Sequence, residues 1–152
     1  MVEANHDTLG FLVVEVARLL RRRYDRALDR AGLGLTHAEA RTLALIGRAP
    51  GRRQASLAEA LAIEPMTLTG LLDRLEAAGL VARRTDPADR RAKLVAATPK
   101  ARPALGAIAA VAASVLDETT RGLSIAEVEA VRVALAQMRE NLAAEAPADA
   151  LA

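Results

Sequence analysis

The signals that mark the ends of helices and strands lie close together between residues 57 and 98, and they fix the order of the elements there. A short helix is followed by a break, and Pro65 begins a second helix, where its restricted φ suits the first helical position. Two short strand-like runs, 80–85 and 92–97, flank the turn 86–89, and the Asp-Pro pair of this segment favours a turn. Two helices followed by a strand hairpin predict a winged helix-turn-helix, a fold that reads duplex DNA.

The rest of the chain is divided by helix caps. The capping-box pattern, in which a hydroxyl and a carboxylate bond to free amides of the first helical turn, occurs at Thr36 with Glu39, Ser56 with Glu59, and Ser124 with Glu127. Glycines that suit a left-handed helix end follow at positions 32, 79 and 122. These signals predict helices near 8–31, 37–48, 56–62, 65–78, 99–121 and 125–144.

Composition supports a mainly α fold. Hydrophobic residues make up 52% of the chain and are chiefly Ala, Leu and Val, while Phe11 and Tyr24 are the only aromatic residues. So few aromatic residues disfavour a sheet sandwich and a site for single-stranded nucleic acid, where bases stack on aromatic rings. The absence of cysteine excludes disulfides and thiolate metal sites. With no long apolar run and no signal peptide, we expect no membrane association and a cytoplasmic location.

The helices at the two ends of the chain carry apolar residues at helical spacing. Within the predicted last helix the apolar residues recur every three or four positions, at Val128, Val131, Leu135, Met138 and Leu142. This spacing is typical of a coiled-coil-like seam. We predict that segments 8–32 and 102–145 join two copies of the chain into a homodimer, and the alternative is a monomeric helical bundle.

The helix that begins at Pro65 is the candidate for insertion into the major groove. The N-terminal side chains of such a helix reach base edges, so we predict Met66, Thr67, Thr69 and Arg74 as DNA-binding residues. Thr hydroxyls and methyls contact bases, and arginine binds guanine or phosphate. On local evidence alone, an ordinary surface helix is the alternative.

The predicted hairpin is rich in basic residues. Five of them lie between positions 83 and 93, namely Arg83, Arg84, Arg90, Arg91 and Lys93, against Asp86 and Asp89. A hairpin with arginines at its tip can enter the minor groove, where the negative potential is concentrated. We predict Arg84, Asp89, Arg90 and Arg91 as the DNA-binding residues of the hairpin, and the alternative is a solvated charged face.

The stretch LAEALAIEPMTLTGLLDRLEAAGLVARRTDPADRRAKLVAATPK resembles the MarR family of bacterial transcriptional regulators in the order and spacing of its parts. The resemblance implies one MarR-type domain over residues 1–152, with the winged helix-turn-helix at 33–101. It also implies that Arg90 enters the minor groove, and that Asp89 and Arg91 form ion pairs and phosphate contacts. At Gly70 many relatives carry a basic residue, so this chain lacks one expected phosphate contact.

Regulators of this family usually sense a small aromatic or anionic molecule between the outer helices and the reading head. By position, the resemblance suggests Arg22, Arg23, Tyr24 and His37 for such a site. The alternatives are a solvated helix face for the arginines, a core position for Tyr24 and an exposed first turn for His37.

The sequence contains no nucleotide loop, HExxH motif or convincing nucleophile and base, so we expect no cofactor, no metal and no enzyme activity. The leading hypothesis is a DNA-binding regulator, most simply a ligand-responsive homodimeric repressor of a pseudo-palindromic operator. The rival is a winged-helix protein-interaction module without DNA binding. Such a module should present apolar residues where this chain has polar and basic ones.

Overall fold

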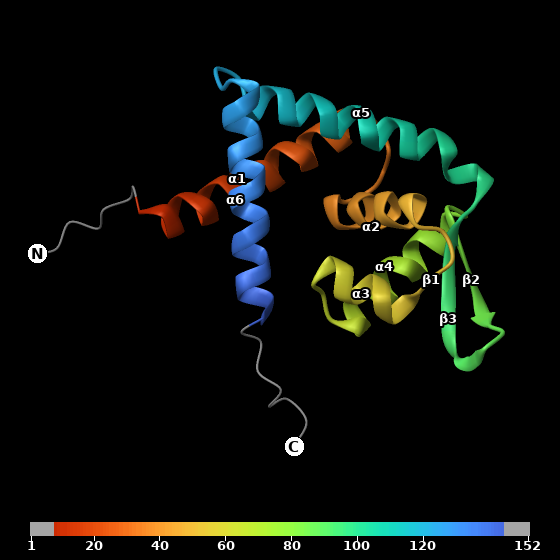
Figure 1. Cartoon of the computed structure of the whole chain (residues 1–152). Helices are drawn as coiled ribbons and strands as arrows, with labels where there is room; N and C mark the ends of the chain where they lie inside the picture. The colour runs from red at the N-terminus through yellow and green to blue at the C-terminus, as the bar shows by residue number, and fades with distance from the viewer. Residues whose placement is uncertain (1–7, 145–152) are drawn as a thin grey trace, which may run out of the picture. The chain divides into compact units, whose positions relative to one another are not determined.

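The computed structural model describes residues 8–144 and is mainly helical, with one small antiparallel sheet (Figure 1). The chain divides into two compact units, and the boundary falls after Val115, within α5. The elements, in chain order, are α1 (Leu9–Arg30), α2 (His37–Arg48), β1 (Arg52–Arg53), α3 (Gln54–Leu61), α4 (Pro65–Ala77), β2 (Val81–Asp86), β3 (Asp89–Ala97), the 3-10 turn η1 (Pro99–Ala101), α5 (Arg102–Thr119) and α6 (Ile125–Ala144).

The core of the first unit forms where α2, α3 and α4 pack against the sheet. The leucines of α4 recur at helical spacing and are buried, and they are Leu68, Leu71, Leu72 and Leu75. Leu68, Leu72 and Leu75 belong to one core cluster. The cluster also includes Leu43 and Ile46 of α2, Leu57 of α3 and Val95 of β3, which are 0% exposed. Because one side of α4 is fixed in this core, the opposite side of the helix faces outward.

Two of the three predicted capping boxes are confirmed. The backbone N of Glu39 donates to Oγ1 of Thr36 (3.2 Å), and the backbone N of Thr36 donates to the Glu39 carboxylate (3.0 Å). Ser124 and Glu127 form the same reciprocal pair before α6. The three predicted helix-ending glycines all have positive φ, at +66° for Gly32, +73° for Gly79 and +90° for Gly122.

The predicted capping box at Ser56 and Glu59 is wrong, because α3 begins two residues earlier, at Gln54. Its N-cap is Arg53, and no side chain bonds to the free amides of its first turn. The cause is a strand that the sequence analysis missed. Arg52 and Arg53 form β1, which pairs antiparallel with β3 in a sheet of order β1-β3-β2. The chain leaves this pairing directly into the helix.

The hairpin is confirmed, but its turn is shorter than predicted. Asp86 pairs with Asp89, so that only Pro87 and Ala88 connect the strands, and the register is irregular beside Thr85. The Asp86 carboxylate accepts from the backbone N of Ala88 (2.9 Å), which stabilises the tight turn. Residues 89–91 consequently belong to the start of β3 instead of to the loop.

Several apolar side chains of α1 and α6 are exposed. In α1 only Leu28 is buried, while Leu9 is 66% and Val14 is 69% exposed. In α6, described by itself, no residue is buried, and Val131 is 51% and Leu142 is 70% exposed. A single chain therefore leaves much of the apolar surface of α1 exposed. Residue 145, the last of the predicted dimerisation segment, lies outside the described residues.

Candidate nucleic-acid interface

The N-terminal turn of α4 presents exposed side chains on the side opposite the leucine stripe. Pro65 occupies the first helical position, and Met66 is 80% exposed. Thr67 is also exposed, and within residues 8–144 its hydroxyl makes no hydrogen bond. These two residues are therefore available to an external partner, as the sequence predicts.

Thr69 lies one turn after Met66 and is half-buried. Its hydroxyl donates to the carbonyl oxygen of Pro65 (3.0 Å) and accepts from Nε2 of Gln54 (2.9 Å). Thr69 is predicted from the sequence as a DNA-binding residue, and in the structure both of these hydrogen bonds of its hydroxyl lie within the protein. Gln54 follows β1 at the start of α3, and no local sequence signal indicates this contact.

Arg74 is drawn to the protein by a buried carboxylate. Its Nε lies 2.5 Å from Oε1 of Glu39, whose side chain is 8% exposed against 61% for Arg74. Burial opposes ionisation of Glu39, but the Arg74 guanidinium and the Thr36 amide outweigh it and lower the pKa of the carboxyl. The pair joins α4 to the first turn of α2, so Arg74 has a structural role besides the predicted contact with DNA.

Arg83, which the sequence counts among the basic residues of the hairpin, is neutralised by its neighbours. Its guanidinium lies 2.6 Å from the Glu76 carboxylate and 2.7 Å from that of Asp73, and its side chain is 21% exposed. Hydrogen bonds to Glu76 and then Asp73 raise the pKa of Arg83 further. Since neighbouring side chains of a strand point to opposite faces, Arg84 lies on the other face of β2 and is exposed.

The tip of the hairpin is stabilised by Arg53 and Asp86, which the sequence analysis did not select. Nε and an Nη of Arg53 each lie 2.8 Å from the Asp86 carboxylate, which also accepts from the Ala88 amide. The Ala88 amide and the Arg53 guanidinium outweigh the effect of desolvation and lower the pKa of Asp86. The available signal was the Asp-Pro-Ala turn itself, since an Asp before a tight turn commonly bonds its backbone.

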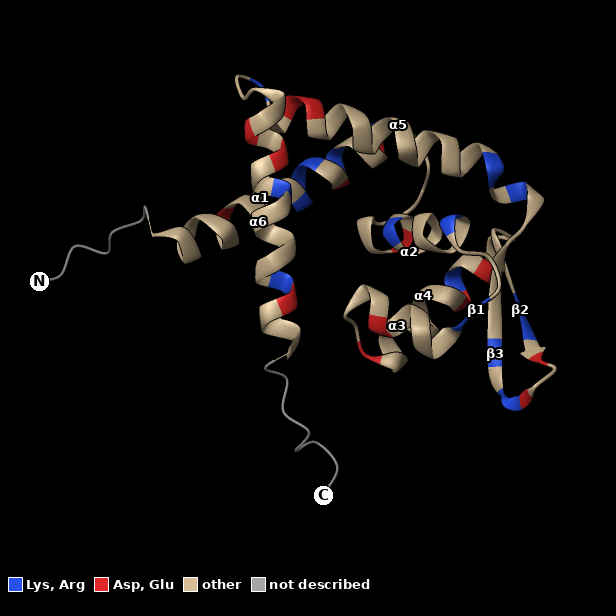
Figure 2. Cartoon of the chain, in the orientation of Figure 1, with Lys and Arg blue, Asp and Glu red and all other residues tan. Residues whose placement is uncertain are grey.

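The predicted wing residues occupy the beginning of β3. Asp89 accepts from the backbone N of Arg91 (3.0 Å), which differs from the ion pair that the family resemblance implies. Arg90 and Arg91 are exposed, and within residues 8–144 neither they nor Arg84 makes an ion pair. Figure 2 shows basic residues on both strands of the hairpin and at its tip. Three arginines consequently remain available for an anionic partner.

A groove of about 440 Å³ separates the hairpin from the beginnings of α3 and α4. It is lined by Arg53, Gln54, Ala55, Pro65, Asp89, Arg91, Ala92 and Lys93. The basic side of the groove is formed by β3, and the polar side by the first turn of α3. Such a concave basic surface suits an anionic partner such as a phosphate backbone.

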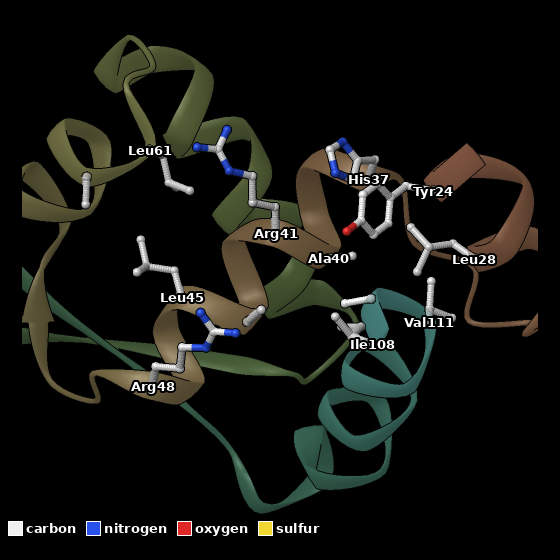
Figure 3. A pocket seen from close by; sticks show the side chains of 13 residues that line it. Tyr24, Leu28, His37, Ala40, Arg41, Leu45, Arg48, Leu61, Ile108 and Val111 are labelled. Atoms are coloured by element: carbon white, nitrogen blue, oxygen red, sulfur yellow. The ribbon is translucent and has the colours of Figure 1, made fainter. Parts of the chain in front are cut away.

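A second cavity, of about 370 Å³, lies in the first unit where α1, α2 and α5 approach one another (Figure 3). The rings of Tyr24 and His37 stack with centroids 5.1 Å apart, and Arg41 and Arg48 line the same cavity. Burial lowers the pKa of His37, and Arg21 and Arg41 act in the same direction against Asp25. Of the four residues predicted for an effector site, Tyr24 and His37 line this cavity, and Arg22 and Arg23 do not.

The sequence model of the MarR family matches residues 35–93. A probable transcriptional regulator from Pseudomonas aeruginosa is 30% identical, with 87% of this chain and 97% of that chain covered and a TM-score of 0.71. This chain belongs to the MarR family. It is a DNA-binding transcriptional regulator and not an enzyme.

Two further MarR-like structures show what relatives of this chain bind. The transcriptional repressor CouR, bound to a 23-mer DNA duplex, is 26% identical over 91% of this chain and 99% of its own, with a TM-score of 0.81. BpsR of Bordetella bronchiseptica, whose DNA binding is regulated by 6-hydroxynicotinic acid, is 26% identical over 91% and 98% of the two chains, also with a TM-score of 0.81.

Membership of the MarR family favours the DNA-binding regulator over the alternative, a winged-helix protein-interaction module without DNA binding, because MarR proteins bind DNA. Within residues 8–144, no helix of this MarR-family regulator is long and apolar enough to cross a membrane. In the same range, no three carboxylate or histidine side chains are arranged to hold a metal ion.

Proposed function

We propose that this MarR-family regulator is a homodimeric repressor that binds a pseudo-palindromic operator and releases it when a small anionic effector binds. The observation that carries the proposal is the basic hairpin beside the exposed first turn of α4. Arg84, Arg90 and Arg91 are free of ion pairs within the described chain, while Arg83 and Arg53 are used to hold the hairpin in place. Two arginines thus stabilise the hairpin through ion pairs, and three others remain exposed on it. This arrangement suits an anionic partner.

We assign the reading of bases to α4 and the contacts with the DNA backbone to the hairpin. Met66, Thr67 and Thr69 would face the major groove, because they lie in the first turns of a helix whose opposite side is buried. Arg90 would enter the minor groove, and Arg84 and Arg91 would bind phosphates.

Asp89 and Arg74 have supporting roles in this proposal. Asp89 fixes the start of β3 by accepting from the Arg91 amide, which positions Arg90 and Arg91. Arg74 holds α4 on α2 through Glu39, and its remaining N–H groups are available to a phosphate.

The dimer is proposed from the apolar side chains at both ends of the chain. Segments 8–32 and 102–145 are the expected interface, and residues such as Leu9, Val14 and Leu142 are more than 60% exposed in the single chain. Side chains of this size in water favour association, since each contributes roughly 1.5–3 kcal/mol when fully buried.

Sedimentation of the full chain at micromolar concentration should show a dimer, and a chain that ends at Gly122 should sediment as a monomer. A monomeric full-length protein would contradict the proposed dimer with its two DNA-binding regions.

The effector site is proposed at the cavity between α1, α2 and α5. The stacked Tyr24 and His37 rings offer a flat apolar surface, and Arg41 and Arg48 offer positive charge at the same cavity. A volume near 370 Å³ suits a small ligand that combines a ring with an anionic group. The regulation of BpsR by 6-hydroxynicotinic acid supports an effector of this kind.

The proposal is tested by selecting bound fragments from random duplex DNA. The expected result is a pseudo-palindrome with half-sites about 10 base pairs apart, one helical turn, as two recognition helices of a twofold dimer require. Aromatic carboxylates should then release the selected duplex from the wild type, and should release it less well from an Arg48→Ala variant. Failure to enrich any sequence would contradict operator binding, and enrichment without any release would contradict only the effector.

A further inference from the structure

The hydroxyl of Thr69 is occupied within the protein, which limits how this residue can contact a base. A threonine hydroxyl has one donor and two acceptor positions. The donor bonds to the Pro65 carbonyl, and one acceptor position is taken by Gln54. A bond from Oγ1 to the carbonyl four residues earlier also fixes the rotamer of the side chain. The Thr69 hydroxyl is thereby held in place, and the methyl group is the part of the side chain that these hydrogen bonds leave available.

Thr69 shares its side of the helix with an exposed apolar residue. Met66 precedes it by three positions, so the two side chains are neighbours on one face, and Met66 is 80% exposed. Gln54 approaches this face from the beginning of α3 and binds the hydroxyl. The two residues that α4 places there thus offer a thioether and a methyl group, while the amide of Gln54 covers the hydroxyl.

From this arrangement we infer that Met66 and the Thr69 methyl form an apolar contact for the C5-methyl group of a thymine in the major groove, with Gln54 as the positioning residue that withholds the hydroxyl. The C5-methyl is the one apolar group by which a thymine is recognised there. The inference rests on the proposed entry of α4 into the major groove, and it adds which chemical group of the base is read.

The first test compares two substitutions of Thr69 that each keep one of its groups. Thr69→Val keeps the methyl and loses the hydroxyl, whereas Thr69→Ser does the opposite. Both are titrated, with the wild type, on the selected operator and on operators in which single thymines of each half-site are replaced by uracil, which lacks only the methyl.

At one thymine, uracil should weaken wild-type binding about four-fold per half-site, the equivalent of transferring one methyl group out of water. Thr69→Val should bind within about two-fold of the wild type and keep this uracil effect. Thr69→Ser should bind the thymine operator about four-fold more weakly per half-site and be indifferent to uracil at that position.

Two results would overturn the inference. If Thr69→Val binds the operator more weakly than Thr69→Ser does, the hydroxyl is the reading group. If no uracil substitution changes wild-type affinity, no methyl is read. In both cases the wild type still selects an operator, so the proposed function stands, and only the absence of a selected operator would count against that function.

The second test addresses Gln54 through its effect on base preference, which a purely structural role would not change. Gln54→Leu keeps much of the side-chain volume but frees the Thr69 hydroxyl, which can then donate to or accept from a base. Selection with this variant should show a broader preference at the thymine position than selection with the wild type does.

The double variant Gln54→Leu/Thr69→Val supplies the matched control, because it has no hydroxyl to free. It should regain the thymine preference of the wild type. If the broadened preference persists in the double variant, Gln54 acts on the base by itself, and its assignment as a positioning residue is wrong.

Discussion

Replacing Arg74 with Ala should destabilise the fold, because Arg74 is the ion-pair partner of a buried carboxylate. Breaking a fully buried pair costs about 3–5 kcal/mol, whereas an exposed pair contributes about 0.2–1 kcal/mol. The Glu39 side chain is 8% exposed and that of Arg74 is 61% exposed, so the pair lies between these limits. We expect a loss of roughly 1–2 kcal/mol in the free energy of unfolding, comparable to one charge-assisted hydrogen bond.

The effect should depend on pH in a defined direction. The pKa of Glu39 is lowered in the folded chain, since the Arg74 guanidinium and the Thr36 amide outweigh burial. A lowered carboxyl pKa stabilises the fold above the unfolded value of about 4.3, and this stabilisation is lost as the pH falls through the folded pKa. Without Arg74, the pKa of Glu39 should be lowered less. The difference between wild type and Arg74→Ala should therefore be constant above about pH 5.5 and diminish in more acidic solution.

Urea unfolding followed by circular dichroism measures this difference, at equal protein concentration because a dimer's stability depends on it. Glu39→Gln is the matched control, since it removes the charge and one of the two acceptor oxygens while keeping the size of the side chain. Arg74→Ala should cost less in that background than in the wild type. If Arg74→Ala leaves the urea midpoint at pH 7 unchanged and weakens only operator binding, Arg74 is a DNA contact and its pair with Glu39 does not stabilise the fold.

Three further predictions concern the DNA-binding face. Arg90→Ala should weaken binding to operator and random duplexes alike and reduce the salt dependence by about one phosphate equivalent per wing, as titrations at several salt concentrations would show; unchanged affinity and salt slope would remove the wing from the interface. Gly70→Ala should raise the free energy of unfolding by about 1 kcal/mol, because a Cβ there meets only Nη1 of Arg74, at 3.8 Å, and Ala favours the helix; destabilisation in urea would contradict this. In a chain without cysteine, mild peroxide should affect DNA binding only through methionines such as the exposed Met66, so any loss should resist thiol reductants, and recovery with dithiothreitol would argue against it.

The parts of the fold that follow from short-range rules were predictable from the sequence. The capping boxes at Thr36 and Ser124 and the glycine-ended helices depend on residues three or four positions apart, and the structure confirms them. The leucine stripe of α4 is equally local. Ser56 shows the limit of such rules, because its capping pattern is overridden when Arg53 pairs with Leu94, a partner far along the chain.

The candidate sites depended more on contacts between distant residues, and there the sequence was a weaker guide. The charge run of the hairpin was visible, but which arginines remain free is decided by Glu76 for Arg83 and by Asp86 for Arg53. At the second cavity, the packing of α1, α2 and α5 brings Arg41 and Arg48 to the lining, where position in the sequence had favoured Arg22 and Arg23.

Because Arg53 belongs to β1, precedes α3 and holds Asp86 at the hairpin turn, the hairpin cannot swing freely against the helices that follow β1. The separation between a major-groove contact and a minor-groove contact is then a fixed length of the protein. In a duplex the matching length changes with local twist, so overwinding or underwinding an operator moves one contact away from its groove. We therefore expect occupancy of the operator to vary with the superhelical density of the plasmid that carries it.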